Sequence, residues 1–468
     1  MLCSSVARAT DLRERLDSLV ALDAAAGASW SILFTDLSSG ESLLERNADL
    51  LLIPASVTKL WTTAAAFSLL GPDYRMVTKF CSSAPLDGGG TLNGNLQVVV
   101  GGDPMFEPKS RKDLGRPALD KIADELHGKG LRKVAGNLDI TVNRFDRTCG
   151  NGVWEMGDLR EGFAPAVDGA GYNSNVCHIE IAPGLSEGDP AIVTINPPFA
   201  GIKIYNDVLT ASPSNESWIE FHVMPCRDEL ELSGVMARGD DSQYIWFPIQ
   251  NPALYFGHAL SEALKRKGIE VAGQVVQTRD GGLLANTLLE FSSPELSVIA
   301  SIVNKESDNY LAEYLLSAIG LQQYGEGNTD AGLRGVQKFA RELGIRRDQF
   351  SLQDGCGLSR QNIVSARAIV DLLAKMGKGK NADGFEASLS HSGMDGTLSG
   401  RLSTEGMLGR VRAKTGTMTH VSALAGYMAL DDGRRVAFAI LANNFRCSPH
   451  YVRNIQDTIV RAVYRAAN

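Results

Sequence analysis

Three short motifs combine residue types that can perform nucleophilic catalysis. They are S-V-T-K at residues 56–59, S-D-N at residues 307–309 and K-T-G at residues 414–416. Each motif alone is weak evidence, because S-x-x-K arises readily by chance, and a given tripeptide occasionally, in a chain of 468 residues. Together, in this order and each in a fitting local context, they indicate a single active site.

The first motif pairs a hydroxyl with an amine. On a helix, positions i and i+3 lie on one face, so Ser56 and Lys59 can share a proton. Serine is a poor nucleophile until a base removes its proton, and a lysine serves as that base only where burial or another cation, such as Lys414, disfavours its ammonium. We interpret Ser56 as the nucleophile and Lys59 as its general base. The alternative is an ordinary helix start, with Ser56 as a cap and Lys59 in solvent.

The second motif falls at a polar break between two helical runs, where a loop can present its side chains to a cleft. Ser307 can relay a proton to a leaving amine, and Asn309 can both donate to and accept from a substrate peptide. The alternative is a polar turn without a catalytic role.

The third motif lies on a predicted strand. Lys414 and Thr415 offer an ammonium and a hydroxyl to a substrate carboxylate. Gly416 permits the close approach of a substrate backbone, and the N–H of Thr417 can complete an oxyanion hole with that of Ser56. The alternative is a strand end with no function.

The elements that must position these motifs follow an α/β pattern. Apolar spacing and a final glycine predict a buried helix over residues 54–71. The third motif begins a series of strand-like segments that includes a tight D-D-G turn at residues 431–433. Near the two ends of the chain we expect a hairpin over residues 29–45 and amphipathic helices over residues 9–22 and 450–467.

The middle of the chain has a different composition. From about residue 78 to about residue 285 it is rich in Gly, Pro and Asn, with short strand-like pieces separated by turn signals. One helix is predicted there, over residues 251–268. This pattern predicts one α/β domain that is interrupted by a β-rich insertion.

Composition argues against several classes of function. Lys plus Arg total 46 against 54 for Asp plus Glu, a net charge of −8, which gives no support to a nucleic-acid partner or a strongly anionic membrane surface. No apolar run approaches the roughly 20 residues of a membrane span. The seven cysteines form no C-x-x-C pair, the histidines form no H-E-x-x-H, and no phosphate-binding glycine loop occurs. We therefore expect neither a metal nor a nucleotide cofactor.

The first ten residues, MLCSSVARAT, bear on targeting. They lack the apolar core of a secretory leader, although Ala7-Arg8-Ala9 resembles a cleavage site. We expect a leader that is absent or truncated in this chain, and the alternative is an ordinary helix lead-in.

The three motifs, in this order, resemble those of penicillin-binding proteins and serine β-lactamases. Ser56 and Ser307 are 251 positions apart. So long a separation resembles the class C low-molecular-mass penicillin-binding proteins, the D-alanyl-D-alanine carboxypeptidase/endopeptidase family (peptidase family S13), rather than the compact β-lactamases. Five further segments read like that family: VVVGGDPMF (98–106), DLREGFAPAVDGAGYNSN (158–175), DGCGLSR (354–360), MDGTLSGRL (394–402) and KTGTMTHVSALAGYMAL (414–430).

The resemblance implies a multi-domain fold of the α/β class. A transpeptidase-like domain, with a central antiparallel sheet flanked by helices as in penicillin-binding proteins and β-lactamases, would carry β-rich nested insertions. The implied boundaries are residues 1–77 and 286–468 for the transpeptidase-like domain, residues 78–165 and 245–285 for insertion domain II, and residues 166–244 for the nested insertion domain III.

The resemblance also implies a chemistry. Peptidoglycan stem peptides would acylate Ser56 and lose their terminal D-alanine, and β-lactam antibiotics would be covalent inhibitors at the same residue. Asp158 and Arg360 would line a pocket for the diamino-acid side chain of the stem. The family implies no cofactor, allows a homodimer, and works in the periplasm or otherwise outside the cytoplasmic membrane.

Two residues depart from the family pattern. Cys356 replaces the serine of D-G-S-G-L-S-R, as a small buried residue or as a reactive thiol, and Thr415 replaces the serine of the commoner K-S-G but keeps its hydroxyl. Two functional alternatives stay open. One is a β-lactamase or a D-stereospecific peptidase/esterase on the same scaffold, and the other is a catalytically inactive scaffold protein that binds peptidoglycan.

Overall fold

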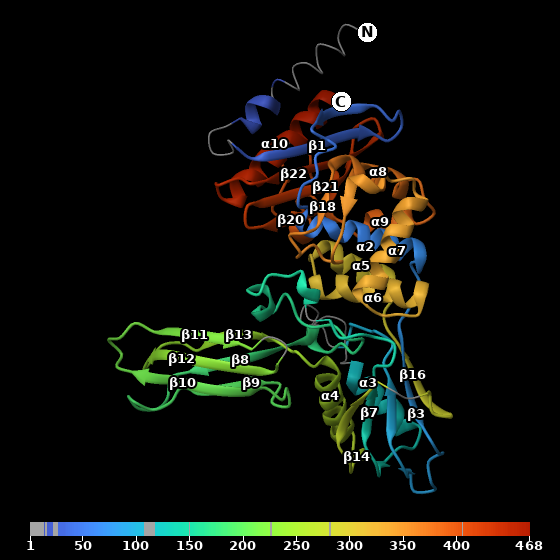
Figure 1. Cartoon of the computed structure of the whole chain (residues 1–468), viewed down its shortest axis with the longest axis vertical. Coiled ribbons are helices and arrows are strands. Elements are labelled where there is room, and N and C mark those ends of the chain that lie inside the picture. Colours follow the sequence, from blue (N-terminus) through green and yellow to red (C-terminus); the bar gives the residue numbers. More distant parts are fainter. Residues whose placement is uncertain are drawn as a thin grey trace. The chain divides into compact units, whose positions relative to one another are not determined.

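The computed structural model describes residue 14 and residues 16–21, 27–106, 118–148, 150–224, 227–279, 282–404 and 406–468. These residues form two compact units, which are coloured along the chain in Figure 1. Unit 1 comprises the chain up to Tyr74 together with Glu295–Tyr324 and Thr329–Asn468, and unit 2 comprises Arg75–Pro294 and Gly325–Asn328. Of the helix predicted over residues 9–22, residue 14 and residues 16–21 are described, and residues 14 and 16–20 are helical; Cys3, Cys149 and Cys226 lie outside the described residues.

Unit 1 is built on a six-stranded sheet in the order β19-β20-β21-β22-β1-β2, in which every neighbouring pair is antiparallel. Its strands are β1 (Ser29–Asp36), β2 (Ser42–Arg46), β19 (Ser390–His391), β20 (Val411–Met418), β21 (Val421–Ala429) and β22 (Arg435–Asn443). The predicted hairpin over residues 29–45 and the predicted C-terminal strands are confirmed. β22 lies between β21 and β1, so it connects the C-terminal strands of the sheet to the N-terminal hairpin.

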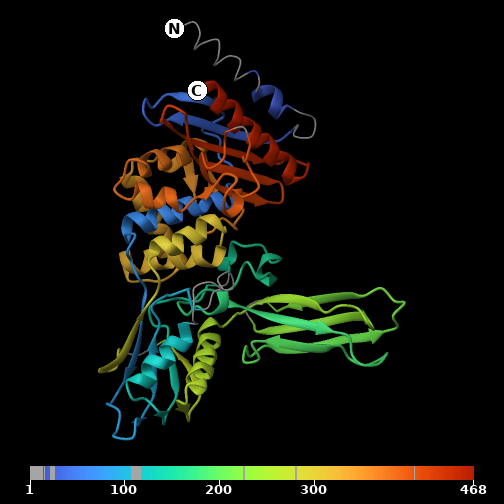
Figure 2. The same cartoon turned by 180° about the vertical axis from the view of Figure 1, so that it is seen from behind.

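Helices cover both faces of this sheet. On one face lies α10 (Pro449–Ala467), whose apolar residues form one hydrophobic cluster with those of β21 and β22 and with Leu16 and Val20 of the N-terminal helical residues. Six other helices of the described part of unit 1 lie on the opposite side (Figures 1 and 2). They are α2 (Lys59–Leu69), α5 (Leu296–Lys305), α6 (Asn309–Tyr324), α7 (Thr329–Glu342), α8 (Ala366–Met376) and α9 (Ala382–Ala387), with a short hairpin of β17 (Phe350–Ser351) and β18 (Ile363–Val364). Because both faces are covered, β21 and β22 are buried along almost their whole length.

Unit 2 is rich in strands, as the composition predicts. One five-stranded sheet has the order β15-β7-β5-β3-β16, and a small sheet has the order β14-β6-β4. These strands are β3 (Val77–Ser82), β4 (Thr91–Leu92), β5 (Leu96–Val99), β6 (Lys133–Val134), β7 (Leu138–Thr141), β14 (Glu270–Val271), β15 (Val275–Thr278) and β16 (Asn286–Ser292), accompanied by helices α3 (Ala118–Gly128) and α4 (Pro252–Arg266).

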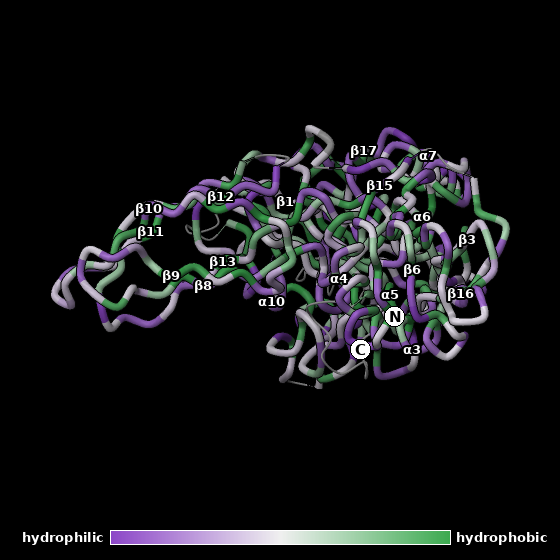
Figure 3. Tube along the Cα trace, turned by 90° about the horizontal axis from the view of Figure 1, so that it is seen from below, coloured by the Kyte–Doolittle hydropathy of each residue, from purple (hydrophilic) through white to green (hydrophobic). Residues whose placement is uncertain are grey.

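Two three-stranded sheets, β10-β12-β11 and β13-β8-β9, complete unit 2. Their strands are β8 (Val176–Ala182), β9 (Ile192–Asn196), β10 (Lys203–Ala211), β11 (Trp218–Val223), β12 (Glu229–Ala237) and β13 (Gln243–Pro248). Residues of higher and lower exposure alternate along β9 and β11, and Figure 3 shows hydrophobic and hydrophilic residues interleaved in this region. The inward-facing residues form a hydrophobic cluster. The division into insertion domains 78–165 with 245–285 and 166–244 stays a prediction.

None of the helices in the described part of the chain has the length and apolar character of a membrane span.

Candidate active site

The first motif lies where a turn enters a buried helix. Ser56 belongs to a single 3-10 turn, Ala55–Thr58, which leads directly into α2 at Lys59. The helix predicted over residues 54–71 is therefore shorter, because its first turn has the tighter 3-10 geometry. The side chains still meet as the spacing predicts, since Lys59 Nζ donates a hydrogen bond of 2.9 Å to Ser56 Oγ.

Lys59 is enclosed by acceptors. Besides Ser56 Oγ, its Nζ donates to Asn309 Oδ1 and to the carbonyl oxygen of Cys356, both at 2.7 Å. An ammonium has three donors, so these contacts use all of them. Burial lowers the pKa of Lys59 below its usual value, and the carboxyl groups of Asp354 and Asp308 act in the opposite direction.

The second motif connects α5 to α6, as the sequence predicts. Ser307 has a φ of +63°, in the left-handed region that costs a residue other than glycine about 1–3 kcal/mol. Asp308 Oδ1 accepts from the N–H of Leu311 at 2.8 Å and so holds the first turn of α6, whose first residue is Asn309. This strained turn directs Ser307 toward the third motif, because Ser307 Oγ accepts a hydrogen bond of 2.8 Å from Lys414 Nζ.

The third motif lies on β20, which runs directly against the turn that carries Ser56. A Cβ atom built on Gly416 would lie 2.5 Å from the carbonyl oxygen of Pro54 and 3.1 Å from the N of Ser56, so only glycine fits there. The pKa of Lys414 lies well below its usual value, mainly through burial and then through the charge of Lys59. The sequence suggests Lys414 as the cation that lowers the pKa of Lys59, but burial is the main cause at both lysines.

The remaining predicted residues are placed as follows. Thr415 Oγ1 donates to Thr397 Oγ1 at 2.8 Å, and Thr417 is exposed on β20 one residue after Gly416. Arg360 Nη1 donates to the carbonyl oxygen of Thr419 at 3.2 Å. Asp158 begins a 3-10 helix of unit 2 (Asp158–Arg160), and its role stays a prediction.

Two residues beside the motifs escaped the sequence analysis, although each had a signal. Thr397 belongs to the segment MDGTLSGRL, which resembles the family. Glu313 follows Asn309 by four positions on α6, a spacing that places both on one helix face.

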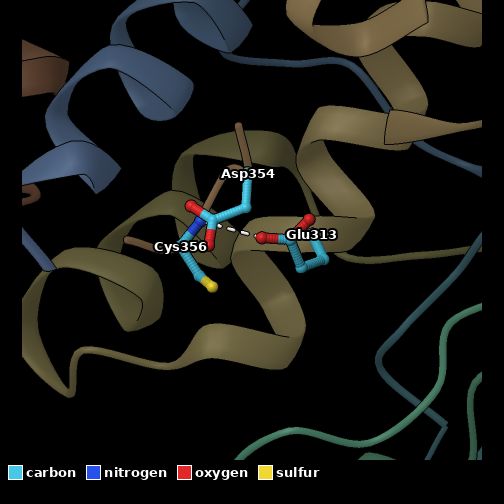
Figure 4. Close-up of side chains that lie close together, drawn as sticks. All are labelled: Glu313, Asp354 and Cys356. Atoms are coloured by element: carbon cyan, nitrogen blue, oxygen red, sulfur yellow. Dashed lines mark hydrogen bonds between the residues drawn. The ribbon is translucent and has the colours of Figure 1, made fainter. Parts of the chain in front are cut away.

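Glu313, Asp354 and Cys356 form a buried cluster (Figure 4). Such a trio has the donor types of a metal site, but Glu313 Oε1 accepts from two backbone N–H groups, of Gly355 and Cys356, and both oxygens of Asp354 also accept from backbone N–H groups. Cys356 is fully buried, and burial raises its pKa far above the ordinary range. Of the two interpretations of Cys356, the structure therefore supports the small buried residue over the reactive thiol.

Known proteins resemble this chain over most of its length. Residues 12–466 match the D-Ala-D-Ala carboxypeptidase 3 (S13) family. The chain is 31% identical over 472 residues to a D-alanyl-D-alanine carboxypeptidase of Actinomadura sp. (strain R39), covering 97% of this chain and 85% of that protein. It is 27% identical over 430 residues to the D-alanyl-D-alanine carboxypeptidase DacB of Haemophilus influenzae, covering 90% of this chain and 86% of that protein.

The fold is similar to that of a solved structure. The crystal structure of penicillin binding protein 4 (dacB) from Haemophilus influenzae matches with a TM-score of 0.84 at 24% identity, covering 96% of this chain and 99% of that chain. This similarity confirms the expected fold class.

Proposed function

The chain belongs to the D-Ala-D-Ala carboxypeptidase 3 (S13) family, and from this premise we propose that Ser56 performs the serine-type D-Ala-D-Ala carboxypeptidase reaction of that family. One observation carries the assignment to Ser56. Its Oγ is hydrogen-bonded at 2.9 Å to Lys59, a lysine whose burial favours the neutral, basic form.

The reaction begins at the Ser56 hydroxyl. Neutral Lys59 takes the proton from Ser56 Oγ while this oxygen attacks the carbonyl carbon of the penultimate D-alanine. The N–H groups of Ser56 and Thr417 stabilise the oxyanion that develops, an arrangement supported by the contact of β20 with the Ser56 turn. The charge forms only during the reaction, so donors fixed in advance lower the barrier.

Collapse of this intermediate releases D-alanine. The C–N bond breaks, and the leaving amine receives through Ser307, whose Oγ is linked to Lys414, the proton that Lys59 took from Ser56, so that Lys59 is neutral again. Water then attacks the ester carbon of the acyl-enzyme, and Lys59 takes a proton from that water. Lys59 gives this proton to Ser56 Oγ as the ester bond breaks, and the shortened peptide leaves with a terminal carboxyl group. Lys414 and Thr415 hold the terminal carboxylate, Asn309 holds the substrate backbone, and Arg360 and Asp158 recognise the diamino-acid side chain.

The natural substrate is the peptidoglycan stem peptide, with D-amino-acid cross-links as a second target. β-Lactams acylate Ser56, which is supported by a similar penicillin binding protein 4 that has been solved as a complex with a β-lactam. An enzyme with this substrate works outside the cytoplasmic membrane, in the periplasm where one is present, and we propose a homodimer as its assembled form.

A peptide assay tests the proposal. We expect the protein to release free D-alanine from a stem-peptide mimic that ends in D-Ala-D-Ala, and to leave a matched peptide ending in D-Ala-L-Ala intact. Ser56→Ala is the control and should release none. A wild-type protein that releases no D-alanine, or a Ser56→Ala variant as fast as the wild type, contradicts the assignment.

The same protein can be tested for the two alternatives. A β-lactamase would clear its penicilloyl adduct faster than it cleaves any peptide, whereas a carboxypeptidase holds the adduct for many peptide turnovers. An inactive scaffold protein would sediment with purified peptidoglycan but form no adduct and release no D-alanine.

A further inference from the structure

A buried carboxylate lies behind the lysine of the first motif. Glu313 is only 4% exposed and lies one helical turn after Asn309 on α6. Its Oε1 accepts hydrogen bonds of 2.8 Å from two consecutive backbone N–H groups, those of Gly355 and Cys356. Figure 4 shows the bond from Cys356. A single oxygen therefore fixes the orientation of this backbone segment.

The carbonyl groups of the same two residues face α2. The Cys356 carbonyl oxygen accepts from Lys59 Nζ at 2.7 Å, and the Gly355 carbonyl oxygen accepts from Thr62 Oγ1 at 2.7 Å. The backbone of this segment thus links the carboxylate of Glu313 on α6 to the amine of Lys59 on α2, since each side chain is hydrogen-bonded to it.

The next residues of this loop, 357–359, are held by the side chain of Asp354 and not by Glu313. Asp354 Oδ1 accepts from the N–H of Gly357 at 2.7 Å, and its Oδ2 accepts from the N–H of Ser359 at 2.6 Å. Gly357 has a φ of +87°, and a Cβ atom there would lie 1.9 Å from the carbonyl oxygen of Ala55, next to Ser56. Asp354 therefore shapes the turn, whereas Glu313 holds the two residues whose carbonyls reach α2.

We propose that Glu313 is a positioning residue for the reaction, which acts by aiming the Cys356 carbonyl at Lys59 Nζ and so fixing the amine beside Ser56 Oγ. This inference rests on the proposed function of Ser56. It assigns to the backbone of Cys356 a role that does not need its thiol.

The charge of Glu313 adds a second effect. Other ionisable groups lie near Glu313 and Lys59 in three places: Lys59 itself on α2, Asp308 just before α6, and Asp354 and Cys356 in the loop. Lys414 on β20 faces Lys59 in turn. Burial, followed by the charge of Asp354, raises the pKa of Glu313 to about 7, and ionised Glu313 raises that of Lys59.

Two substitutions separate position from charge. Glu313→Gln keeps an oxygen that accepts from both N–H groups but removes the charge, and Glu313→Ala removes both. The measurement is the rate constant for acylation by benzylpenicillin, followed by intact-protein mass spectrometry across a range of pH. Glu342→Gln, an exposed carboxylate of α7, is the matched control.

We expect Glu313→Ala to slow acylation on the order of tenfold to 100-fold, because the amine loses its alignment. Glu313→Gln should keep most of the plateau rate, and the acid limb of its pH profile should move to lower pH, because Lys59 loses a neighbouring negative charge. If Glu313 had only a structural role, Glu313→Gln would lower the acylation rate at every pH and leave the acid limb of the pH profile at its wild-type position.

Three results overturn the inference: wild-type rates in both variants, an equal loss of rate in both, or an acid limb of Glu313→Gln that does not move. If Glu313→Ala fails to fold, the inference is tested by Glu313→Gln alone, through the position of the acid limb in the pH profile of its acylation rate. A failure of the proposed function looks different from these results: the wild-type protein itself would form no penicillin adduct.

Discussion

Three segments of the chain each supply one acceptor to the ammonium of Lys59: the turn at Ser56, the start of α6 at Asn309 and the loop at Cys356. The contact with Ser56 was predicted from the spacing of the motif, whereas Asn309 was predicted to meet a substrate peptide and not Lys59. The Cys356 carbonyl could not be predicted, because every residue has a carbonyl and the sequence does not reveal where it points.

Lys59→Met tests the base directly. Methionine fills the buried space without an amine, so acylation by penicillin should slow by roughly 10²–10⁴-fold, the usual contribution of a general base. Quenched-flow mass spectrometry of the adduct measures the rate. Lys375→Met, at an exposed position of α8, is the control.

A base at Lys59 also predicts how the wild-type rate depends on pH. A lysine can act as a base only when it is neutral, so the rate at which penicillin acylates the wild-type protein should fall as the pH drops through the pKa of Lys59. A Lys59→Met variant that is acylated at the wild-type rate would show that another group removes the proton.

At the scale of elements, β20 must lie against the Ser56 turn. The sequence predicts that Gly416 admits a substrate backbone, but it does not predict the close approach of the protein's own turn, because the pairing of a strand with a distant turn leaves no local pattern. The structure shows that this approach is made by the backbone of Pro54 and Ser56.

Gly416→Ala should therefore separate β20 from the turn. We expect a loss of acylation on the order of 100-fold and a destabilisation of about 1–3 kcal/mol from overpacking. Penicillin acylation and thermal unfolding measure the two effects. Gly400→Ala is the control, since nothing lies within 4 Å of a Cβ atom there. Equal behaviour of the two variants would contradict this account of the strand.

A buried carboxyl in unit 2 gives a prediction about stability. Asp103 follows β5, is 1% exposed, and accepts from the N–H of Met105 at 2.8 Å. Burial raises its pKa from 3.8 to about 7. The folded state then holds a proton that the unfolded state releases, so stability falls as the pH rises from about 4 to about 7.

Asp103→Asn keeps the acceptor and removes this titration. Relative to the wild type, the variant should gain roughly 2–3 kcal/mol of stability between about pH 5 and about pH 8. Thermal unfolding at both pH values, with Glu125→Gln as an exposed control in unit 2, gives the measurement. An offset between variant and wild type that does not change with pH would mean that Asp103 ionises normally.

At the scale of the whole molecule, unit 1 is assembled from distant parts of the sequence. The change in composition after about residue 78 made the insertion predictable. The order of the sheet was not, because β1 pairs with β22 about 400 residues later and nothing local records that pairing.

The insertion leaves and re-enters unit 1 at one place. The carbonyl oxygens of Pro72 and Tyr74 accept from the N–H groups of Ser297 and Leu296 at 3.0 and 2.9 Å. A chain in which a short Gly/Ser linker replaces residues 75–294 should therefore fold and still be acylated by penicillin at Ser56, since unit 1 has its own core. Circular dichroism and adduct mass measure this, and a shortened chain that is folded but never acylated would show that unit 2 completes the site.

The central claim is that Ser56 is the nucleophile of a penicillin-sensitive carboxypeptidase, and intact-protein mass spectrometry with benzylpenicillin tests it most directly. The account predicts that the wild type gains the mass of one penicillin molecule, that peptide mapping places it on Ser56, and that Ser56→Ala gains none. No increase in the wild type, or the same increase in Ser56→Ala, would contradict it.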